Sequence, residues 1–143
     1  MKKSYDFSQR AKNPNLKRII VSVKIENAFD LSKSLRCDAF VDSRVSLMVL
    51  PAVWKGRLGR LESTRIIAIG NLVQGAINVE ACGPVRIQIE GFRPIHTELV
   101  FVELESDVEE FKPLLGHIVL AQSQATVDLP GNRLVQIKHV DLK

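Results

Sequence analysis

The stretch that decides the fold is DAFVDSRVSLMVLP, residues 38–51. In it a short apolar run typical of a β-strand, AFV, ends on the carboxylate of Asp42. Ser43 and Arg44 follow, and the chain is apolar again from residue 47 to residue 50. Burying a carboxylate among such neighbours is costly unless the group is paired, hydrogen-bonded or protonated. The stretch therefore predicts either an ordinary strand-end turn, where Asp and Ser are common, or a site in which Asp42 has a specific partner.

On both sides of this stretch the sequence is typical of β-structure. Apolar side chains occupy every second position in residues 19–25 and again in residues 85–89. Further strands are predicted at residues 37–41, 65–69, 76–82, 96–103, 125–129 and 133–137. Helical signal is limited to one turn in residues 51–58 and a short helix in residues 116–124. We therefore expect an all-β fold, a small closed barrel or sandwich with one short C-terminal helix.

The sequence also repeats itself loosely. Three segments recur in the same order: VSVKIEN (21–27) as VRIQIEG (85–91), AFVD (39–42) as VFVE (100–103), and MVL (48–50) as IVL (118–120). The matching segments are 64, 61 and 70 residues apart. This recurrence predicts two related halves joined by internal pseudo-twofold symmetry.

Composition predicts one folded domain preceded by a short arm. The chain has 143 residues, of which 45% are hydrophobic and 25% charged, values typical of a globular protein. Residues 1–16 are polar and basic, and we expect a flexible arm there, with the folded domain in residues 17–143. The net charge is +4, but no basic run is interleaved with aromatic residues, so we do not expect nucleic-acid binding.

Several site classes are not expected from this sequence. The cysteines, Cys37 and Cys82, form no CxxC pair, and the three histidines are far apart, so we expect no disulfide framework, no metal site and no cofactor. Apolar runs are shorter than the ~20 residues needed to cross a bilayer, and the N-terminus has no signal-peptide core. The expected location is therefore cytoplasmic, with no membrane partner.

Three features together resemble the retropepsin-like (retroviral-type) aspartic proteases. In that family an apolar strand leads into Asp-Thr-Gly or Asp-Ser-Gly, and FVDSRVSLMVLP has Asp42 and Ser43 at the first two positions. The segment PLLGHIVL (113–120) resembles the family's second signature, an apolar pair followed by Gly and a short helix. Between them, residues 66–92 have the order of the flap hairpin and the strands after it. The chain thus looks like a bacterial-type, single-domain member with a degenerate Asp-Ser-Arg motif.

The resemblance implies a homodimer that acts on a peptide or protein substrate. Each subunit would bring Asp42 to the twofold axis, where the two carboxylates share a proton; one activates a water while the other polarises the scissile carbonyl. Ser43 would fit the hydroxyl position that braces the two active-site loops. The active loop would be supported from beneath by Leu114, Leu115 and Gly116. The mobile flap over the cleft would consist of Ile69, Gly70, Asn71, Leu72, Val73, Gln74 and Gly75.

One residue departs from the family's motif, because Arg44 stands where the family has Gly. The Gly allows a tight bend and a close approach to the twin loop, which a long side chain obstructs. A guanidinium beside the dyad also favours ionised carboxylates and opposes the shared proton. Arg44 could point outward, or the two arginines could salt-bridge the aspartates and hold the dimer at rest. Two functions are therefore left open: an aspartic endopeptidase, and a non-catalytic, protease-like dimer (a pseudoprotease) that binds peptide without cleavage.

Overall fold

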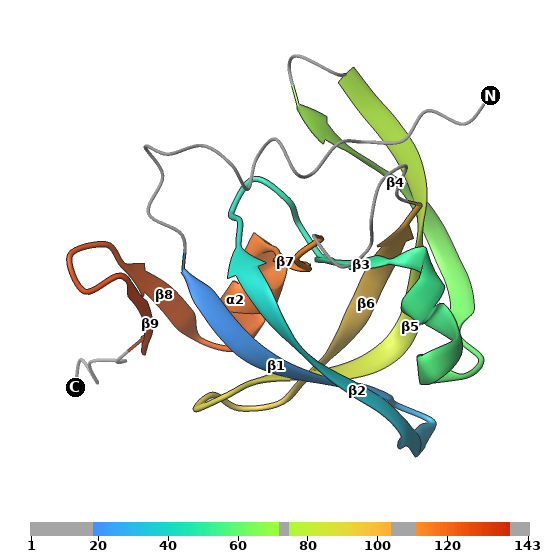
Figure 1. The fold of residues 1–143 in the computed structure, drawn as a ribbon, viewed down its shortest axis with the longest axis horizontal. Helices are drawn as coiled ribbons and strands as arrows, with labels where there is room; N and C mark the ends of the chain where they lie inside the picture. Colours follow the sequence, from blue (N-terminus) through green and yellow to red (C-terminus); the bar gives the residue numbers. More distant parts are fainter. Residues whose placement is uncertain (1–18, 72–74, 104–110, 138–143) are drawn as a thin grey trace, which may run out of the picture.

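β-Strands make up most of the part of the protein that the structure describes, as the alternating sequence predicts (Figure 1). The structure, a computed structural model, describes residues 19–71, 75–103 and 111–137. Its strands are β1 (Ile20–Asn27), β2 (Asp30–Val41), β3 (Met48–Pro51), β4 (Glu62–Asn71), β5 (Gly75–Ile89), β6 (Ile95–Val102), β7 (Leu114–Leu115), β8 (Ala125–Asp128) and β9 (Arg133–Gln136). A 3-10 helix, η1 (Ala52–Leu58), and an α-helix, α2 (His117–Gln122), are the helical elements.

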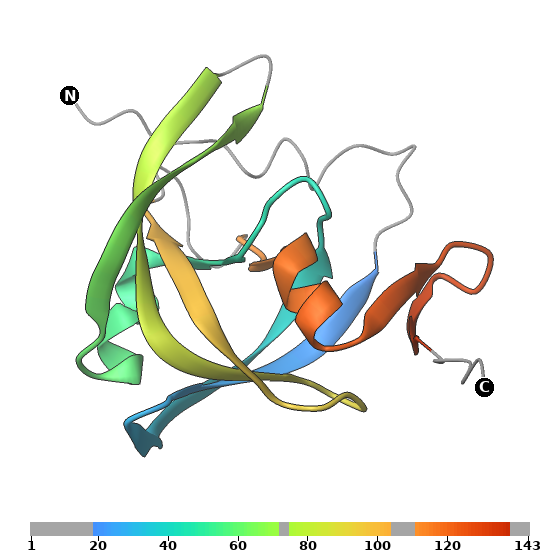
Figure 2. The ribbon, with the colours of Figure 1, turned by 180° about the vertical axis from the view of Figure 1, so that it is seen from behind.

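Six strands close into a ring. The sheet order is β1-β2-β7-β3-β6-β5-β4, and an additional pairing of β1 with β5 joins the ends of the first six strands. β4 stays outside the ring as the outer strand of a long hairpin with β5, and the β8–β9 hairpin forms a separate two-stranded sheet (Figures 1 and 2). The expected all-β, closed fold with one short α-helix is confirmed.

The strand pairings agree with two related halves. β2 runs parallel to β7, and β3 runs parallel to β6. Exchanging β2 with β6 and β3 with β7 therefore leaves the set of parallel strand pairs unchanged. The first repeat pairs with its own copy, because β1 and β5 are antiparallel neighbours with Lys24 opposite Gln88. The third sequence match was wrong: residues 48–50 lie in β3, whereas residues 118–120 lie in α2. Three apolar residues recur in any buried segment, strand or helix, so such a short match carries little information.

Several strand boundaries differ from the sequence prediction, and β3 and β7 were not predicted as strands; the largest differences are in β2 and β5. β2 begins at Asp30, well before residue 37, and its first half is mostly exposed because it pairs with β1 in a hairpin. Exposed strands need no apolar alternation, so this part of the sequence carried no strand signal. The strands predicted at 76–82 and 85–89 are one strand, β5, with a register shift between Cys82 and Val85.

The core consists of two apolar clusters on opposite faces of shared strands. In β3, Met48 and Leu50 belong to the larger cluster and Val49 to the smaller one. In β6, Leu99 and Val100 divide between the clusters in the same way. β3 is therefore buried on both faces, which explains why its sequence is continuously apolar rather than alternating.

A buried polar residue ties η1 to the ring. Asn27, 4% exposed, donates through Nδ2 to the carbonyls of Leu58 and Arg60, both at 2.9 Å, and its Oδ1 accepts from the Phe29 N–H at 2.9 Å. A buried amide with its donors and acceptor satisfied holds the end of η1 at one position. This anchor gave no recognisable signal in the sequence.

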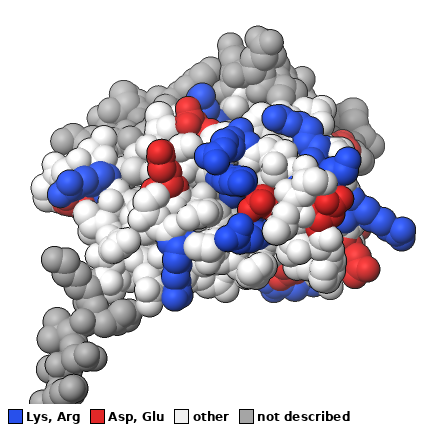
Figure 3. Space-filling view, turned by 90° about the horizontal axis from the view of Figure 1, so that it is seen from below, with Lys and Arg blue, Asp and Glu red and all other residues white. Residues whose placement is uncertain are grey.

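The surface carries charges of both signs. On the face seen in Figure 3, Lys and Arg side chains are interspersed with Asp and Glu side chains. Within residues 19–71, 75–103 and 111–137, no helix is long and apolar enough to cross a membrane.

Candidate active site

Asp42 lies immediately after β2, where its backbone is held by the neighbouring β7 segment. Its N–H donates to the Leu115 carbonyl at 3.0 Å, and the Phe40 N–H donates to the Pro113 carbonyl at 2.8 Å. The residue is 8% exposed. The sequence thus places a carboxylate at the end of a strand, and pairing with β7 buries it.

The loop after Asp42 folds back on this carboxylate and rests on α2. The Arg44 N–H donates to Asp42 Oδ1 at 3.0 Å, which is an Asx-type turn. The carbonyl of Val45 accepts from the His117 N–H at 2.9 Å, and that of Ser46 accepts from the Ile118 N–H at 3.0 Å. The first N–H groups of a helix have no partner within the helix, and here loop carbonyls supply two.

Gly116 lies against this loop at a distance that excludes any side chain. A Cβ at this position would be 2.5 Å from the carbonyl carbon and oxygen of Ser46 and 2.5 Å from the carbonyl oxygen of Leu47. Leu114 and Leu115 are buried on either side of the sheet, one in each apolar cluster. The packing gives a physical reason for Gly at this position, while the role of these three residues in an active site remains a prediction.

The side chain of Arg44 is bound to the carboxylate of Asp42. Nε lies 3.0 Å from Oδ1, and Nη2 donates to Oδ2 at 3.4 Å. The Arg44 side chain is 53% exposed, whereas that of Asp42 is 8% exposed. Of the two arrangements left open by the sequence, the subunit has the ion pair, and it forms within one chain.

With this geometry, the chain can be compared with known proteins. No protein-family model matches it, and no curated protein sequence matches it. Among solved structures, it is similar to the EIAV protease complexed with the inhibitor HBY-793, with a TM-score of 0.56 and 21% sequence identity. The similarity covers 82% of this chain and 99% of that one. The chain has a retropepsin-like fold.

In the retropepsin-like fold of this chain, the β4–β5 hairpin corresponds in order to the predicted flap. The hairpin extends from the ring on the same side as the segment between β2 and β3 (Figures 1 and 2). Ile69 is buried in the smaller apolar cluster, and the backbone of Asn71 is paired with Gly75. The predicted flap residues 72–74 lie outside the described residues. Gly70 is paired with Ala76, and the predicted mobility of the flap is untested.

His117 contacts the active loop, and the sequence did not predict this. Its Nδ1 lies 2.9 Å from the Val45 carbonyl oxygen and 3.2 Å from that of Ser43. Both partners are acceptors, so Nδ1 carries a proton and donates. The position of His117 directly after Gly116 was the sequence feature that could have indicated this contact. Ser43 itself is exposed in the single subunit, and its predicted bracing of the two loops remains a prediction.

No candidate metal centre is found in the described part of the chain. Among its His, Cys, Asp and Glu residues, no three or more are grouped so that they could hold an ion.

Proposed function

We propose that this chain forms a retropepsin-like homodimer that binds a peptide or protein segment and, in its resting state, does not cleave it. The observation that carries this proposal is the ion pair between Arg44 and Asp42, in which both carboxylate oxygens accept hydrogen bonds from one guanidinium. Oδ1 additionally accepts from the Arg44 N–H. Three donor groups of its own chain therefore contact the carboxylate.

Hydrolysis by a carboxylate dyad requires a different electrostatic state. Two carboxylates about 3 Å apart share one proton, so that one acts as base and the other as acid. In a dimer of this chain, two guanidinium groups would balance the charges of the two carboxylates. Both carboxylates would then be ionised, without a shared proton. An ionised pair has a base but no acid, which removes half of the mechanism.

Peptide binding is a separate property and does not need the shared proton. Extended peptides bind to exposed strand edges through main-chain hydrogen bonds, and side-chain pockets provide specificity. The long β4–β5 hairpin beside the Asp42 loop offers such edges. The EIAV protease of the same fold is complexed with an inhibitor, and we propose that a peptide occupies the equivalent cleft of the dimer.

A second candidate is a slow aspartic endopeptidase, and the exposure of Arg44 favours it. Exposed ion pairs contribute about 0–1 kcal/mol, and hydrogen bonds to charged groups about 1.5–3 kcal/mol. If breaking the pair costs about 1–3 kcal/mol, Asp42 is unpaired in roughly 1–15% of molecules. Turnover would then be slow rather than absent.

Cleavage of a peptide library between pH 3 and pH 8 separates the two candidates. The proteins compared are the natural chain, Arg44→Gly, Asp42→Asn, the double variant, and the matched control Arg60→Gly, which removes an exposed arginine away from Asp42. We expect no turnover in the natural chain or the control, a gain of turnover in Arg44→Gly, and loss of that gain in the double variant.

Other results of the cleavage assay would favour the endopeptidase or exclude both candidates. Turnover by the natural chain that is lost in Asp42→Asn would establish the endopeptidase. Turnover that survives Asp42→Asn would exclude the dyad altogether. Sedimentation equilibrium tests the shared premise, because a chain that stays monomeric at high concentration contradicts both candidates.

A further inference from the structure

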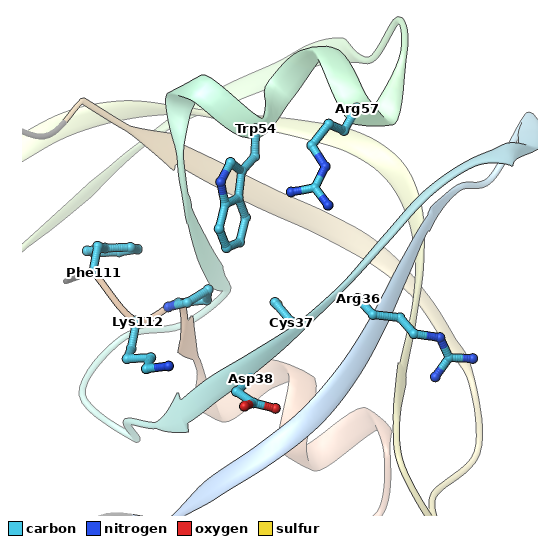
Figure 4. A pocket seen from close by; sticks show the side chains of 8 residues that line it. Arg36, Cys37, Asp38, Trp54, Arg57, Phe111 and Lys112 are labelled. Atoms are coloured by element: carbon cyan, nitrogen blue, oxygen red, sulfur yellow. The ribbon is translucent and has the colours of Figure 1, made fainter. Parts of the chain in front are cut away.

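A cavity of about 310 Å³ opens between β2, η1 and the segment that precedes β7 (Figure 4). It shares β2 with the candidate active site but lies elsewhere on it. Its β2 residue nearest to that site, Asp38, precedes Asp42 by four residues, which is about 13 Å along a strand. The cavity is formed within one subunit and depends neither on Asp42 nor on a dimer.

The floor and one wall of the cavity are apolar. The indole of Trp54 extends from η1 toward β2, where the thiol of Cys37 forms part of the floor (Figure 4). Phe111 and Pro113 complete this lining. Burial, with a smaller contribution from the charge of Asp38, raises the pKa of the Cys37 thiol to about 12. The thiol is therefore neutral, and this end of the cavity favours an apolar group.

The rim is charged, with cations in excess. The guanidinium of Arg57 lies over the Trp54 ring, 5.4 Å from its centroid, and Lys112 lines the cavity from the segment before β7. Arg36 also borders the cavity, but its guanidinium points away from Trp54 (Figure 4). Among the described residues of the lining, Asp38 is the one that carries a carboxylate. Lys112 lies on the other side of Cys37 from Arg57 (Figure 4), so Arg57 is the cation beside the aromatic surface, an arrangement that suits a carboxylate.

The volume limits the ligand to a small molecule or one residue of a peptide. Ligand sites usually measure about 300–1,000 Å³, and a cavity of about 150 Å³ accommodates a benzene ring. The space here holds one ring and a substituent of similar size. We propose that this cavity binds an aromatic carboxylate, with its ring against Trp54 and Cys37 and its carboxylate at Arg57. The ligand is either a free aromatic acid or the C-terminal aromatic residue of a peptide.

Trp54 makes the proposal directly testable, because it is the only tryptophan in the chain. Its fluorescence is followed while the full chain is titrated with phenylacetate, N-acetylphenylalanine and N-acetylphenylalaninamide. The last two probes differ in the carboxylate alone. We expect a saturable change with at least one acid, and binding of the amide roughly tenfold to a hundredfold weaker, the range for losing hydrogen bonds to a charged group.

A comparison of two peptides identifies the source of the carboxylate. Acetyl-Ala-Ala-Phe with a free C-terminus is compared with the same peptide amidated. Tighter binding of the free-acid peptide than of phenylacetate assigns a peptide C-terminus, and the reverse assigns a free aromatic acid. Absence of saturation with every acid, or equal binding of acid and amide, would overturn the proposal.

Variants test whether Arg57 binds the carboxylate. Arg57→Ala should weaken binding of the acids by roughly tenfold or more and Lys112→Ala should weaken it less, with little effect of either variant on binding of the amides. Arg60→Ala is the matched control, since it removes an exposed arginine three residues from Arg57 that does not line the cavity. Calorimetry supplements fluorescence, because Arg57 contacts the reporter, and circular dichroism verifies that each variant is folded. Equal weakening in Arg60→Ala would refute the assignment.

Discussion

Replacing Gly116 by Ala should destabilise the protein far more than an ordinary Gly to Ala change. The added Cβ would lie 2.5 Å from backbone atoms of Ser46 and Leu47, whereas carbon atoms normally approach to about 3.5–4.0 Å. The loop or α2 must therefore move by about 1 Å. Such a shift disrupts the two hydrogen bonds from the His117 and Ile118 N–H groups to the loop, now 2.9 and 3.0 Å long.

The expected magnitude follows from these contacts. Overpacking typically costs about 1–3 kcal/mol, and each lost hydrogen bond about 1 kcal/mol, giving a loss of about 3–5 kcal/mol in the free energy of unfolding. Urea denaturation, followed by the fluorescence of Trp54, measures this loss. With a urea dependence of about 2 kcal/mol per M, the midpoint should fall by about 1.5–2.5 M.

Gly56→Ala is the matched control for this change. Gly56 lies in η1, and a Cβ there would meet nothing within 4 Å. Its substitution should be neutral or stabilise by up to about 1 kcal/mol, because Ala has less conformational freedom in the unfolded chain. If Gly116→Ala costs less than about 1 kcal/mol, the loop does not rest on Gly116 as described, and the account of the site is wrong.

Further predictions concern a buried amide, a thiol and an imidazole. Asn27→Ala should lower the free energy of unfolding by about 2–4 kcal/mol in urea denaturation, because the buried carbonyls of Leu58 and Arg60 lose their donor. The thiol of Cys37, with its pKa raised from 9.0 to about 12, should react with iodoacetamide at pH 8 at least a hundredfold more slowly than in the urea-unfolded chain, as measured by mass spectrometry; equal rates would contradict its burial. Because the folded-state pKa is raised, the contribution of Cys37 to stability is complete below pH 9.0 and is lost between pH 9.0 and about 12, so the difference in stability from Cys37→Ala should change in that window alone. His117→Ala should cost about 1 kcal/mol through loss of the Nδ1 hydrogen bond to the active loop, and an unchanged urea midpoint would show that this bond contributes nothing.

Local periodicity was sufficient for most of the fold. Alternating apolar residues predicted β1 and the second half of β5, and the resemblance placed a flap hairpin where β4 and β5 lie. Alternation failed for the first half of β2, where both faces are mostly exposed, and β5 appeared as two strands because residues 83–84 interrupt the pattern. The cysteines are unpaired, as expected, with Cys82 buried and Cys37 partly buried.

The candidate site was predictable only in part. Asp42 could be singled out because it interrupts an apolar segment, whereas Gly116 was singled out by the resemblance of residues 113–120 to the second retropepsin signature. The orientation of Arg44 could not be predicted, because an exposed side chain has many rotamers and its choice depends on where the carboxylate lies. The cavity could not be predicted either: Trp54 packs against the larger apolar cluster and, with Arg57, also lines the cavity.

The sequence by itself determined the class of the fold, most of its strands and the position of a carboxylate at the end of one of them. These properties depend on residues close together in the chain, whose side chains alternate between two faces or turn on a glycine. Tertiary structure alone decided that the loop after Asp42 rests on Gly116 and His117, more than 70 residues away. It also decided that Trp54 and Arg57 face Cys37 and Lys112 across one cavity. Contacts of this range form only when the strands pair, because they join residues far apart in the chain. Local sequence patterns contain no information about which surfaces will meet.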